Sequence, residues 1–373
     1  MIISKITITA FKSIQFMDLP IDKNITVLIG PNESGKTNIL KAIESFNLSN
    51  ELTVEQTCQY SELYTEGKPP IIAFELGRFS KEECAKLTKL YEGFRTVESF
   101  SLIKEGSGSN NYKIQTGDKI LSLGNEKPLF DLLPKIIYFD RIQIIKDRVT
   151  LQDFQKGDRD YQTEINLLKI GGVEDPEIIF EDSTRGRRAA EETGKEITRR
   201  IRETWTQAPS LEIKLRVNGN LLYIDFSDDT SVYDTPKSRS PGFLWYLSFY
   251  INFIAKTNEA KANEYLFLLD EPGVHLHPSG QKDLTNLLEN LSEKNQVIFT
   301  THSPFMINRS HPNRVRVVDK TENGTQVDSE AYRENWRPLR QSIGLTVGDM
   351  FFFSSKGIPS DRSSKKSSLF KQK

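Results

Sequence analysis

A glycine-rich segment constrains this sequence more than any other feature. Residues Gly30–Thr37 read Gly-Pro-Asn-Glu-Ser-Gly-Lys-Thr, which matches the pattern G-x-x-x-x-G-K-[ST] in full. The apolar run Ile25–Ile29 directly before it is typical of a short buried strand. Apolar residues then recur at helical spacing from Asn38 to Phe46. A strand, a glycine-rich turn and a helix in succession form the context of a phosphate-binding loop, and a chance turn is the disfavoured alternative.

The residue types in this loop predict a nucleoside triphosphate site. Glycines let backbone N–H groups turn toward phosphate oxygens, and the start of the following helix adds a positive dipole. Lys36 is expected to reach the β- and γ-phosphates, and the hydroxyl of Thr37 is expected to hold Mg²⁺. The expected nucleotide contacts of the segment are Gly30, Pro31, Asn32, Glu33, Ser34, Gly35, Lys36, Thr37 and Asn38.

A second segment supplies the expected acidic partners of the loop. The run Tyr265–Leu269 predicts a buried strand, and Asp270 and Glu271 follow it directly. A carboxylate at the end of a buried strand can orient Mg²⁺, which is the role predicted for Asp270. Glu271 is predicted to polarise the attacking water as a general base. The sequence has no Asn/Thr-Lys-x-Asp motif of the kind that reads guanine, so ATP is favoured over GTP.

One histidine also follows an apolar strand. His302 comes directly after Val297–Thr301, where a side chain can approach the γ-phosphate, and a purely structural loop histidine is the alternative.

Because Lys36 and Asp270 lie far apart in the chain yet must meet in one site, the ATPase head is predicted to be discontinuous. The predicted units are a head formed by 1–46 plus 208–353, an inserted lobe with mixed strands and charged helices at 47–207, and a disordered basic, serine-rich tail at 354–373.

Composition excludes several other classes of protein. The 373 residues carry 50 Lys and Arg against 51 Asp and Glu, which argues against a wholly basic nucleic-acid coat protein. Two cysteines, Cys58 and Cys84, cannot build a disulfide framework and fit a reducing compartment. The longest apolar run, Phe243–Ala255, is shorter than the roughly 20 residues that a membrane-spanning helix needs. We therefore expect a cytoplasmic protein without a membrane partner.

The rest of the chain carries weaker structural signals. Leu211–Val217 alternates between apolar and polar residues, and Asn218-Gly219 followed by Leu221–Phe226 predicts a hairpin. The charged stretch 181–205 predicts an exposed helix, and Phe243–Ala255 predicts a largely buried one. A further helix is predicted over about 278–292, after the acidic motif.

Four segments together resemble a known family. These are Phe11-Lys12-Ser13-Ile14, Gly30–Thr37, the run Leu269–Pro278 with its Asp-Glu-Pro and His-Leu-His-Pro groups, and Thr301–Ile307 with Thr-His-Ser-Pro. They resemble the RecF/SMC-type ABC ATPases and, within that group, the OLD (overcoming lysogenisation defect) family. The resemblance covers about 1–46 and 238–310. It implies an α/β fold, an ABC-type P-loop ATPase head with mixed sheets and an inserted, mainly helical middle region.

The family resemblance also implies further site residues. Arg239–Gly242 resembles a degenerate ABC signature loop, so Ser240 and Gly242 would contact the γ-phosphate held by a second copy of the chain. An ordinary Ser-Pro helix cap is the alternative for this loop. His302 would be the switch histidine, and Lys12 would lie near the nucleotide. Three glutamines remain candidates for the Q-loop position: Gln143, Gln152 and Gln155.

The sequence departs from the OLD pattern near its end. Members of the family usually continue into a Toprim nuclease domain, and Leu345–Phe353 resembles the linker that leads there. In place of a Val-Glu-Gly strand the chain has Ile358–Arg362 and then ends, without a cluster of acids to hold two metals. Nuclease activity is therefore not expected in this chain.

The leading functional hypothesis is an OLD-type ATPase that dimerises around ATP and gates a nuclease or DNA-processing activity, in anti-phage defence. The alternative is a RecF-like DNA-repair protein that uses ATP as a clamp on DNA. Arginines within 185–188 and 199–202 could then contact phosphates, although interleaved acids favour a solvated helix. A regulatory subunit with little turnover is a third reading. The expected partners are a second copy of the chain, DNA, and a separate nuclease or effector subunit.

Overall fold

The computed structural model describes residues 1–90, 98–106, 111–122, 127–139, 142–156, 159–181, 184–229, 235–257, 265–331 and 333–344. The expected tail at 354–373 and the linker-like Leu345–Phe353 lie outside these residues. Among the helices described, none is both long and apolar enough to cross a membrane.

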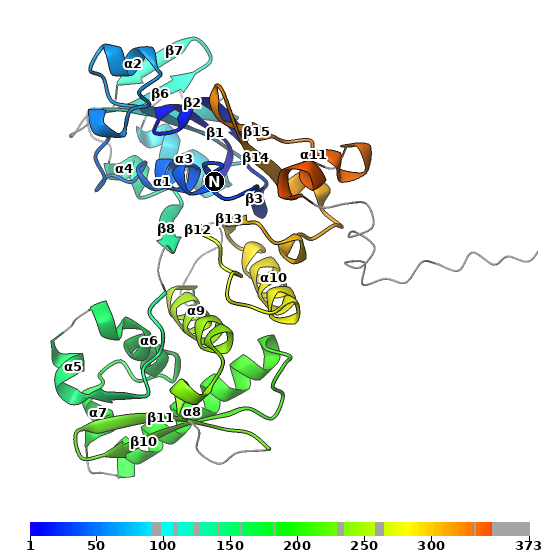
Figure 1. Ribbon diagram of the computed structural model, residues 1–373. Coiled ribbons are helices and arrows are strands. Elements are labelled where there is room, and N and C mark those ends of the chain that lie inside the picture. The colour runs from blue at the N-terminus through cyan, green and yellow to red at the C-terminus, as the bar shows by residue number, and fades with distance from the viewer. Residues whose placement is uncertain are drawn as a thin grey trace, which may run out of the picture.

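One mixed sheet dominates the upper part of the molecule (Figure 1). Within the described residues it has 12 strands in the order β7-β6-β5-β4-β1-β2-β15-β14-β3-β13-β12-β8. Neighbours from β14 to β8 are parallel, and the remaining pairs are antiparallel. The strands are β1 (Ile2–Phe11), β2 (Ile14–Pro20), β3 (Ile25–Ile29), β4 (Ile71–Gly77), β5 (Ser99–Glu105), β6 (Tyr112–Thr116), β7 (Lys119–Ser122), β8 (Lys135–Phe139), β12 (Tyr265–Leu269), β13 (Gln296–Thr301), β14 (Val315–Thr321) and β15 (Gly324–Asp328).

Two helices cover opposite faces of the parallel strands. Successive residues of a strand point to opposite faces, and in β3 Leu28 belongs to one buried cluster while Val27 and Ile29 belong to the other. The first cluster contains the apolar face of α1, and the second contains that of α10. The helices accompanying this sheet are α1 (Lys36–Glu44), α2 (Glu62–Thr65), α3 (Lys81–Leu90), α4 (Lys127–Phe130), α10 (Pro278–Ser292) and α11 (Arg333–Ile343).

A smaller lobe, drawn in green in Figure 1, lies below the sheet. Its three-stranded sheet has the order β10-β11-β9. The predicted hairpin is confirmed as β10 (Glu212–Asn218) and β11 (Leu221–Ser227). The other elements of the lobe are β9 (Arg148–Thr150), α5 (Leu151–Gln155), α6 (Gln162–Ile170), α7 (Glu177–Phe180), α8 (Thr184–Thr204) and α9 (Pro241–Thr257). Short 3₁₀ helices are η1 (Val54–Gln56), η3 (Arg159–Tyr161), η4 (Pro236–Ser238), η5 (Pro304–Met306) and η6 (Pro312–Arg314).

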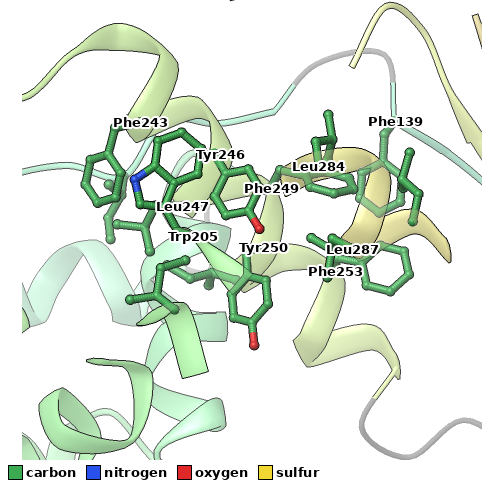
Figure 2. Packing of buried hydrophobic residues seen from close by; sticks show 14 of the residues in the cluster. Phe139, Trp205, Phe243, Tyr246, Leu247, Phe249, Tyr250, Phe253, Leu284 and Leu287 are labelled. Atoms are coloured by element: carbon green, nitrogen blue, oxygen red, sulfur yellow. The ribbon is translucent and has the colours of Figure 1, made fainter. Parts of the chain in front are cut away.

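Helix α9 connects the lobe to the large sheet through its aromatic side chains (Figure 2). At one end of α9, the ring centroids of Tyr246 and Trp205 lie 4.5 Å apart. Farther along, the ring of Phe253 lies 4.5 Å from that of Phe267 on β12. The predicted buried helix is therefore confirmed, and it places the lobe and the parallel strands in one continuous apolar core.

The sheets do not follow the predicted domain boundaries. Strands β4–β8, which lie within the predicted lobe at 47–207, pair into the large sheet, because β4 aligns with the edge of β1 and β8 with the edge of β12. Conversely β10 and β11, which lie within the predicted head segment 208–353, belong to the small sheet. The charged stretch 181–205 is also not exposed on all sides, since Ala190, Ile197 and Ile201 of α8 are buried.

Candidate nucleotide-binding site

Three neighbouring parallel strands end at the same edge of the sheet. In order, β3, β13 and β12 lie side by side. The loop after β3 contains Gly30–Thr37, the loop after β12 begins with Asp270 and Glu271, and the loop after β13 begins with His302. Because ligands of open α/β sheets bind at the carboxyl ends of the strands, the topology brings the sequence-predicted groups to one place.

The two glycines of the loop are required by packing against the β14–β15 hairpin. A Cβ atom on Gly30 would lie 2.0 Å from the carbonyl oxygen of Val318. Gly35 has a φ of +104°, and a Cβ atom there would lie 2.1 Å from the hydroxyl oxygen of Thr325. Any side chain at either position would clash with the hairpin, so the path of the loop depends on glycine at both positions.

Lys36 is folded back onto its own loop. Its side chain is buried, and Nζ donates hydrogen bonds to the carbonyl oxygens of Gly30 at 2.9 Å and Pro31 at 2.8 Å. Nζ also lies 3.6 Å from Oε1 of Glu271. Gly35 occupies the N-cap of α1 in a left-handed conformation, and no side chain of the described residues caps this helix. The first-turn N–H groups of α1 are thus available to an anion.

The segment after β1 supports the same loop. The hydroxyl of Ser13 lies 2.8 Å from that of Thr325 and accepts a hydrogen bond from the Asn38 amide at 2.9 Å. Lys12 lies at the adjacent turn with a φ of +50°. Burial, and secondarily the nearby charge of Lys41, lowers the pKa of Lys12.

Asp270 is held by hydroxyl groups from three elements. Thr37 donates to Oδ2 at 2.8 Å, Tyr138 of β8 donates to Oδ2 at 3.3 Å, and Thr300 of β13 donates to Oδ1 at 2.6 Å. When Thr37 donates its single proton to Asp270, its oxygen lone pairs remain available to a cation. Hydroxyl and carboxylate oxygens are hard ligands that suit Mg²⁺, so the donor set fits the predicted metal.

Glu271 lies between two basic side chains. Its Oε2 is 3.0 Å from Nδ1 of His302, and its Oε1 faces Lys36. The backbone of Glu271 has a φ of +48°, a conformation that non-glycine residues rarely adopt. Its N–H donates to the hydroxyl of Thr300 at 2.8 Å. The predicted catalytic set of Lys36, Glu271 and His302 therefore forms a continuous chain of contacts.

A glutamine couples the loops after β12 and β13. Gln281 on α10 donates from its amide to the carbonyl oxygen of Gly273 at 2.9 Å, and its Oε1 accepts a hydrogen bond from Ser303 at 2.6 Å. Gln281, Thr300, Tyr138 and Thr325 belong to no sequence motif of the predicted site. The available signal for Thr300 was a polar residue in an otherwise apolar strand beside the acidic motif.

The signature-like loop lies against the loop after β12. A Cβ atom on Gly242 would lie 2.5 Å from the carbonyl oxygen of His275, so glycine is required there. The hydroxyl of Ser240 accepts a hydrogen bond from the N–H of Phe243 at 3.2 Å, which is the geometry of a helix cap. Ser240 itself is exposed. A role for Ser240 and Gly242 toward a second copy remains a prediction.

The three candidate Q-loop glutamines belong to the lobe. Gln143 donates to Asp160 at 3.0 Å, and Gln155 donates to Glu177 at 2.8 Å. Gln152 is exposed on α5. The hydrogen bonds that the structure gives for the side-chain amides of Gln143 and Gln155 thus remain within the lobe, away from Asp270 and Glu271.

Several arginines of α8 are paired with acids of the same helix. Arg199 donates to Glu196 at 2.8 Å and to Glu203 at 2.6 Å, and Arg200 donates to Glu196 at 2.6 Å. Hydrogen bonds from Arg199 and Arg200 hold the pKa of Glu196 at about 2. Arg202 donates to the carbonyl oxygen of Leu211. Further ion pairs of this helix are Arg188–Glu192 and Lys195–Glu191.

The fold and this site define a P-loop ATPase of the ABC-like class with the architecture of an SMC head. A family model described as an AAA ATPase domain matches residues 1–183 and 237–307, which is more than half of the chain. The chain therefore belongs to this family of ATPase domains. Its similarity to OLD-type nucleases and its SMC-head-like fold fit an OLD-family, ABC-like ATPase. The stretch 184–236 between the two matched segments contains α8 and the β10–β11 hairpin.

Several known proteins are similar to this chain over different spans. It is 24% identical to the "OLD nuclease" of Thermus scotoductus, covering 89% of this chain and 65% of that protein. It is 25% identical to "Endonuclease GajA" of Bacillus cereus, covering 86% of this chain and 58% of that protein. "Uncharacterized protein MJECL43" of Methanocaldococcus jannaschii is 34% identical over 30% of each chain. The chain thus spans less than two thirds of these relatives.

Solved SMC heads share the fold. An SMC head bound to the C-terminal winged-helix domain of ScpA has a TM-score of 0.51 at 16% identity, covering 88% of this chain and 97% of that chain. An SMC head with an extended coiled coil, bound to the C-terminal domain of ScpA derived from Pyrococcus furiosus, also has a TM-score of 0.51 at 16% identity, covering 88% and 96%. At this identity the likeness concerns the fold alone.

Proposed function

We propose that this chain binds ATP with Mg²⁺ at the edge formed by β3, β12 and β13, hydrolyses it, and joins a second copy of itself around the nucleotide. ATP engagement would gate a nuclease or DNA-processing activity. One observation carries the proposal: Thr37 donates to Asp270, while the adjacent Glu271 spans Lys36 and His302. The anti-phage setting is part of the proposal and rests on the OLD resemblance.

Binding would begin with an exchange of partners at Lys36. Its ammonium group leaves the carbonyl oxygens of Gly30 and Pro31 and donates instead to phosphate oxygens. These N⁺–H···O⁻ bonds are charge-assisted and therefore stronger than bonds to a neutral carbonyl. The open N–H groups at the start of α1 add further donors, and the glycine path of the loop leaves room for the phosphates.

Thr37 and Asp270 are the residues that would hold Mg²⁺. When bound there, the ion would neutralise charge on the phosphates as their bond to the leaving group breaks. The hydroxyl of Thr37 offers its lone pairs while it keeps donating to Oδ2 of Asp270. Hydrogen bonds from Tyr138 and Thr300 keep the Asp270 carboxylate oriented toward Thr37.

Glu271 would act as the general base. Once Lys36 turns to the phosphates, Oε1 of Glu271 loses the neighbour that it has at 3.6 Å and can accept a proton from water. His302 contacts the other carboxylate oxygen at 3.0 Å and so limits rotation of the side chain. The lysine that binds the phosphates therefore also releases the base.

The second copy of the chain would complete the site. Ser240 is exposed beside the start of α9, and Gly242 lies against the carbonyl oxygen of His275 in the loop after Glu271. We propose that this surface faces the γ-phosphate of the partner copy.

For the RecF-like alternative the arginines at 199–202 offer little support, since Arg199 and Arg200 are paired with acids of α8.

The test is ATP hydrolysis by the wild type and two variants, measured as phosphate release with Mg²⁺. Lys36→Ala should remove ATP binding, because the phosphates lose their buried cation. Glu271→Gln should retain ATP binding and slow hydrolysis by roughly 100-fold, a magnitude typical for loss of a general base. Lys68→Ala is the matched control, since this lysine is exposed and pairs with Glu66 on the surface. Wild-type turnover in both site variants would contradict the proposal.

Dimerisation is tested with the slowed variant. Glu271→Gln with ATP should double the mass measured by light scattering, whereas the same protein without nucleotide should not. Adding Ser240→Arg to Glu271→Gln should abolish the doubling while leaving ATP binding by each copy in place. A mass that is independent of ATP in all these proteins would contradict the dimerisation step alone.

A further inference from the structure

Thr300 occupies an unusual place among the buried side chains. It lies on β13 with no exposed surface, in the strand between the P-loop strand and the strand of the acidic motif. Its hydroxyl donates to Oδ1 of Asp270 at 2.6 Å and accepts from the N–H of Glu271 at 2.8 Å. One hydroxyl therefore contacts both acidic residues of the site.

The direction of these two bonds is fixed by chemistry. A threonine hydroxyl has one proton, and an ionised carboxylate can only accept, so the proton of Thr300 must point to Asp270. A lone pair then remains for the N–H of Glu271. What sets Thr300 apart is that both of its partners belong to the acidic motif. Thr26 on β3 is equally buried, but it accepts a hydrogen bond from the N–H of Asp22, outside the site.

Each bond sets one geometric feature of the site. Because Thr300 occupies Oδ1 of Asp270, the other oxygen, Oδ2, is turned toward Thr37. The bond to the N–H of Glu271 supports a backbone with a φ of +48°, which directs the carboxylate between Lys36 and His302. Strained backbone of this kind persists where surrounding contacts over-determine it.

We propose that Thr300 is a positioning residue that sets the metal-facing oxygen of Asp270 and the aim of Glu271 through one hydroxyl group. This inference rests on the proposed ATP hydrolysis. It predicts that loss of the hydroxyl weakens the use of Mg²⁺ and slows turnover, while ATP itself binds as before. Removal of partners that orient metal ligands typically lowers metal affinity or activity by about 10- to 100-fold.

The experiment compares Thr300→Val with Thr300→Ser in the full chain. Valine keeps the shape of threonine and removes the hydroxyl, and serine keeps the hydroxyl and removes the methyl group. For Thr300→Val we expect the Mg²⁺ concentration at half-maximal hydrolysis to rise about 10-fold and kcat to fall at least about 10-fold. Thr300→Ser should keep both the half-maximal Mg²⁺ concentration and kcat within about threefold of the wild type. ATP binding in EDTA should stay within about twofold for both variants.

Thr26→Val is the matched control. It also removes a fully buried hydroxyl from a neighbouring strand, but its partner Asp22 is not a site residue. It should lower the thermal midpoint to an extent similar to Thr300→Val and leave the Mg²⁺ requirement unchanged. If Thr300→Val does not fold, Thr300→Ala is measured in its place with the same readouts.

Two outcomes would overturn the inference. One is an unchanged Mg²⁺ requirement and kcat in a folded Thr300→Val. The other is an equal rise in the Mg²⁺ requirement in Thr26→Val. Failure of the proposed function looks different, because the wild type itself would then lack ATP hydrolysis, or Lys36→Ala would hydrolyse ATP as fast as the wild type.

Discussion

A buried lysine lies at each end of helix α1, and the two lysines differ in their hydrogen-bond partners. Lys36 at the N-terminus donates to two carbonyl oxygens of its own loop and faces an acidic side chain. Lys104 projects from β5 onto the chain that leaves the C-terminus of α1 and donates to three carbonyl oxygens. We therefore expect the ammonium group of Lys36 to exchange its partners readily and that of Lys104 to keep them.

The Lys104 end is closed. Its ammonium group lies 2.7 Å from the carbonyl oxygens of Ser45 and Asn47, and 2.6 Å from that of Asn50. The hydroxyl of Tyr112 donates to the carbonyl oxygen of Phe46 at 2.6 Å. A cation at a helix C-terminus is favoured by the helix dipole. Here it binds the carbonyl oxygen of the C-cap residue Ser45 and two carbonyl oxygens of the chain that follows the helix.

The Lys36 end is open by contrast. Pro31, whose carbonyl oxygen accepts one of the bonds from Lys36, is exposed, so water can replace the ammonium group there. The start of α1 lacks a side-chain cap among the described residues. The antiparallel part of the sheet thus anchors α1 from one end, which leaves the other end to bind and release a charged ligand. The comparison suggests that binding and stability are separable along one helix of nine residues.

The largest expected difference is between Lys104→Met and Lys36→Met. Lys104→Met removes three hydrogen bonds to carbonyl oxygens and should lower the free energy of unfolding by roughly 3 kcal/mol, at about 1 kcal/mol for each bond. Lys36→Met should lower it by about 1 kcal/mol, because the buried carbonyl of Gly30 loses its donor while water can reach that of the exposed Pro31. ATP hydrolysis should show the reverse order, with a fall of at least about 100-fold for Lys36→Met, as for loss of one charge-stabilising donor. Urea unfolding and phosphate release provide the two measurements.

Methionine is chosen because it keeps the length and apolar contacts of lysine. The ATP hydrolysis rate of Lys104→Met is measured without urea, at a temperature where circular dichroism shows that the variant is folded. This rate should stay within about tenfold of the wild type. Equal loss of stability in both variants would contradict the distinction between an open end and a closed end.

Gly35→Ala tests how rigidly the open end is packed. The substitution forces alanine into a φ of +104° and places Cβ 2.1 Å from the hydroxyl oxygen of Thr325. Strain and clash together should lower the free energy of unfolding by about 2 kcal/mol, whereas a Gly-to-Ala change at a compatible site raises it by up to about 1 kcal/mol. The double variant with Thr325→Gly, compared with Thr325→Gly alone in a double-mutant cycle, removes all three Thr325 atoms that the new Cβ would meet and so separates the clash from the backbone strain. Full recovery in the double variant would show that backbone strain contributes nothing.

The open end of α1 could be predicted from sequence and the closed end could not. Strands at 25–29 and 265–269 and the helix at 278–292 are confirmed with their predicted bounds as β3, β12 and α10. Each has a local signal, namely an apolar run beside a motif or an apolar spacing of helical period. The motif residues also reach one edge of the sheet because parallel strands end together.

Long-range pairing explains the part that sequence reasoning missed. Nothing within Ile71–Gly77 shows that it pairs with β1, so the sequence predicts an inserted lobe over the whole stretch 47–207.

A local signal for Lys104 did exist. In β5 the alternation places it on the same face as Phe100 and Leu102, and both of those side chains are buried. A lysine on the apolar face of a strand indicates a buried partner, but the identity of that partner depends on the fold.

The smallest effect is expected for Tyr112→Phe, which isolates one bond of the closed end. The variant keeps the ring that packs against Phe46 and lies 5.2 Å from Nζ of Lys104, and it removes the hydroxyl that donates to the carbonyl oxygen of Phe46. Loss of one buried neutral hydrogen bond should lower the free energy of unfolding by about 1 kcal/mol, measured by urea unfolding, with ATP hydrolysis unchanged. A loss as large as that of Lys104→Met would show that Tyr112 and Lys104 act as one cooperative unit. A change in hydrolysis in the folded variant would show that the two ends of α1 are coupled after all.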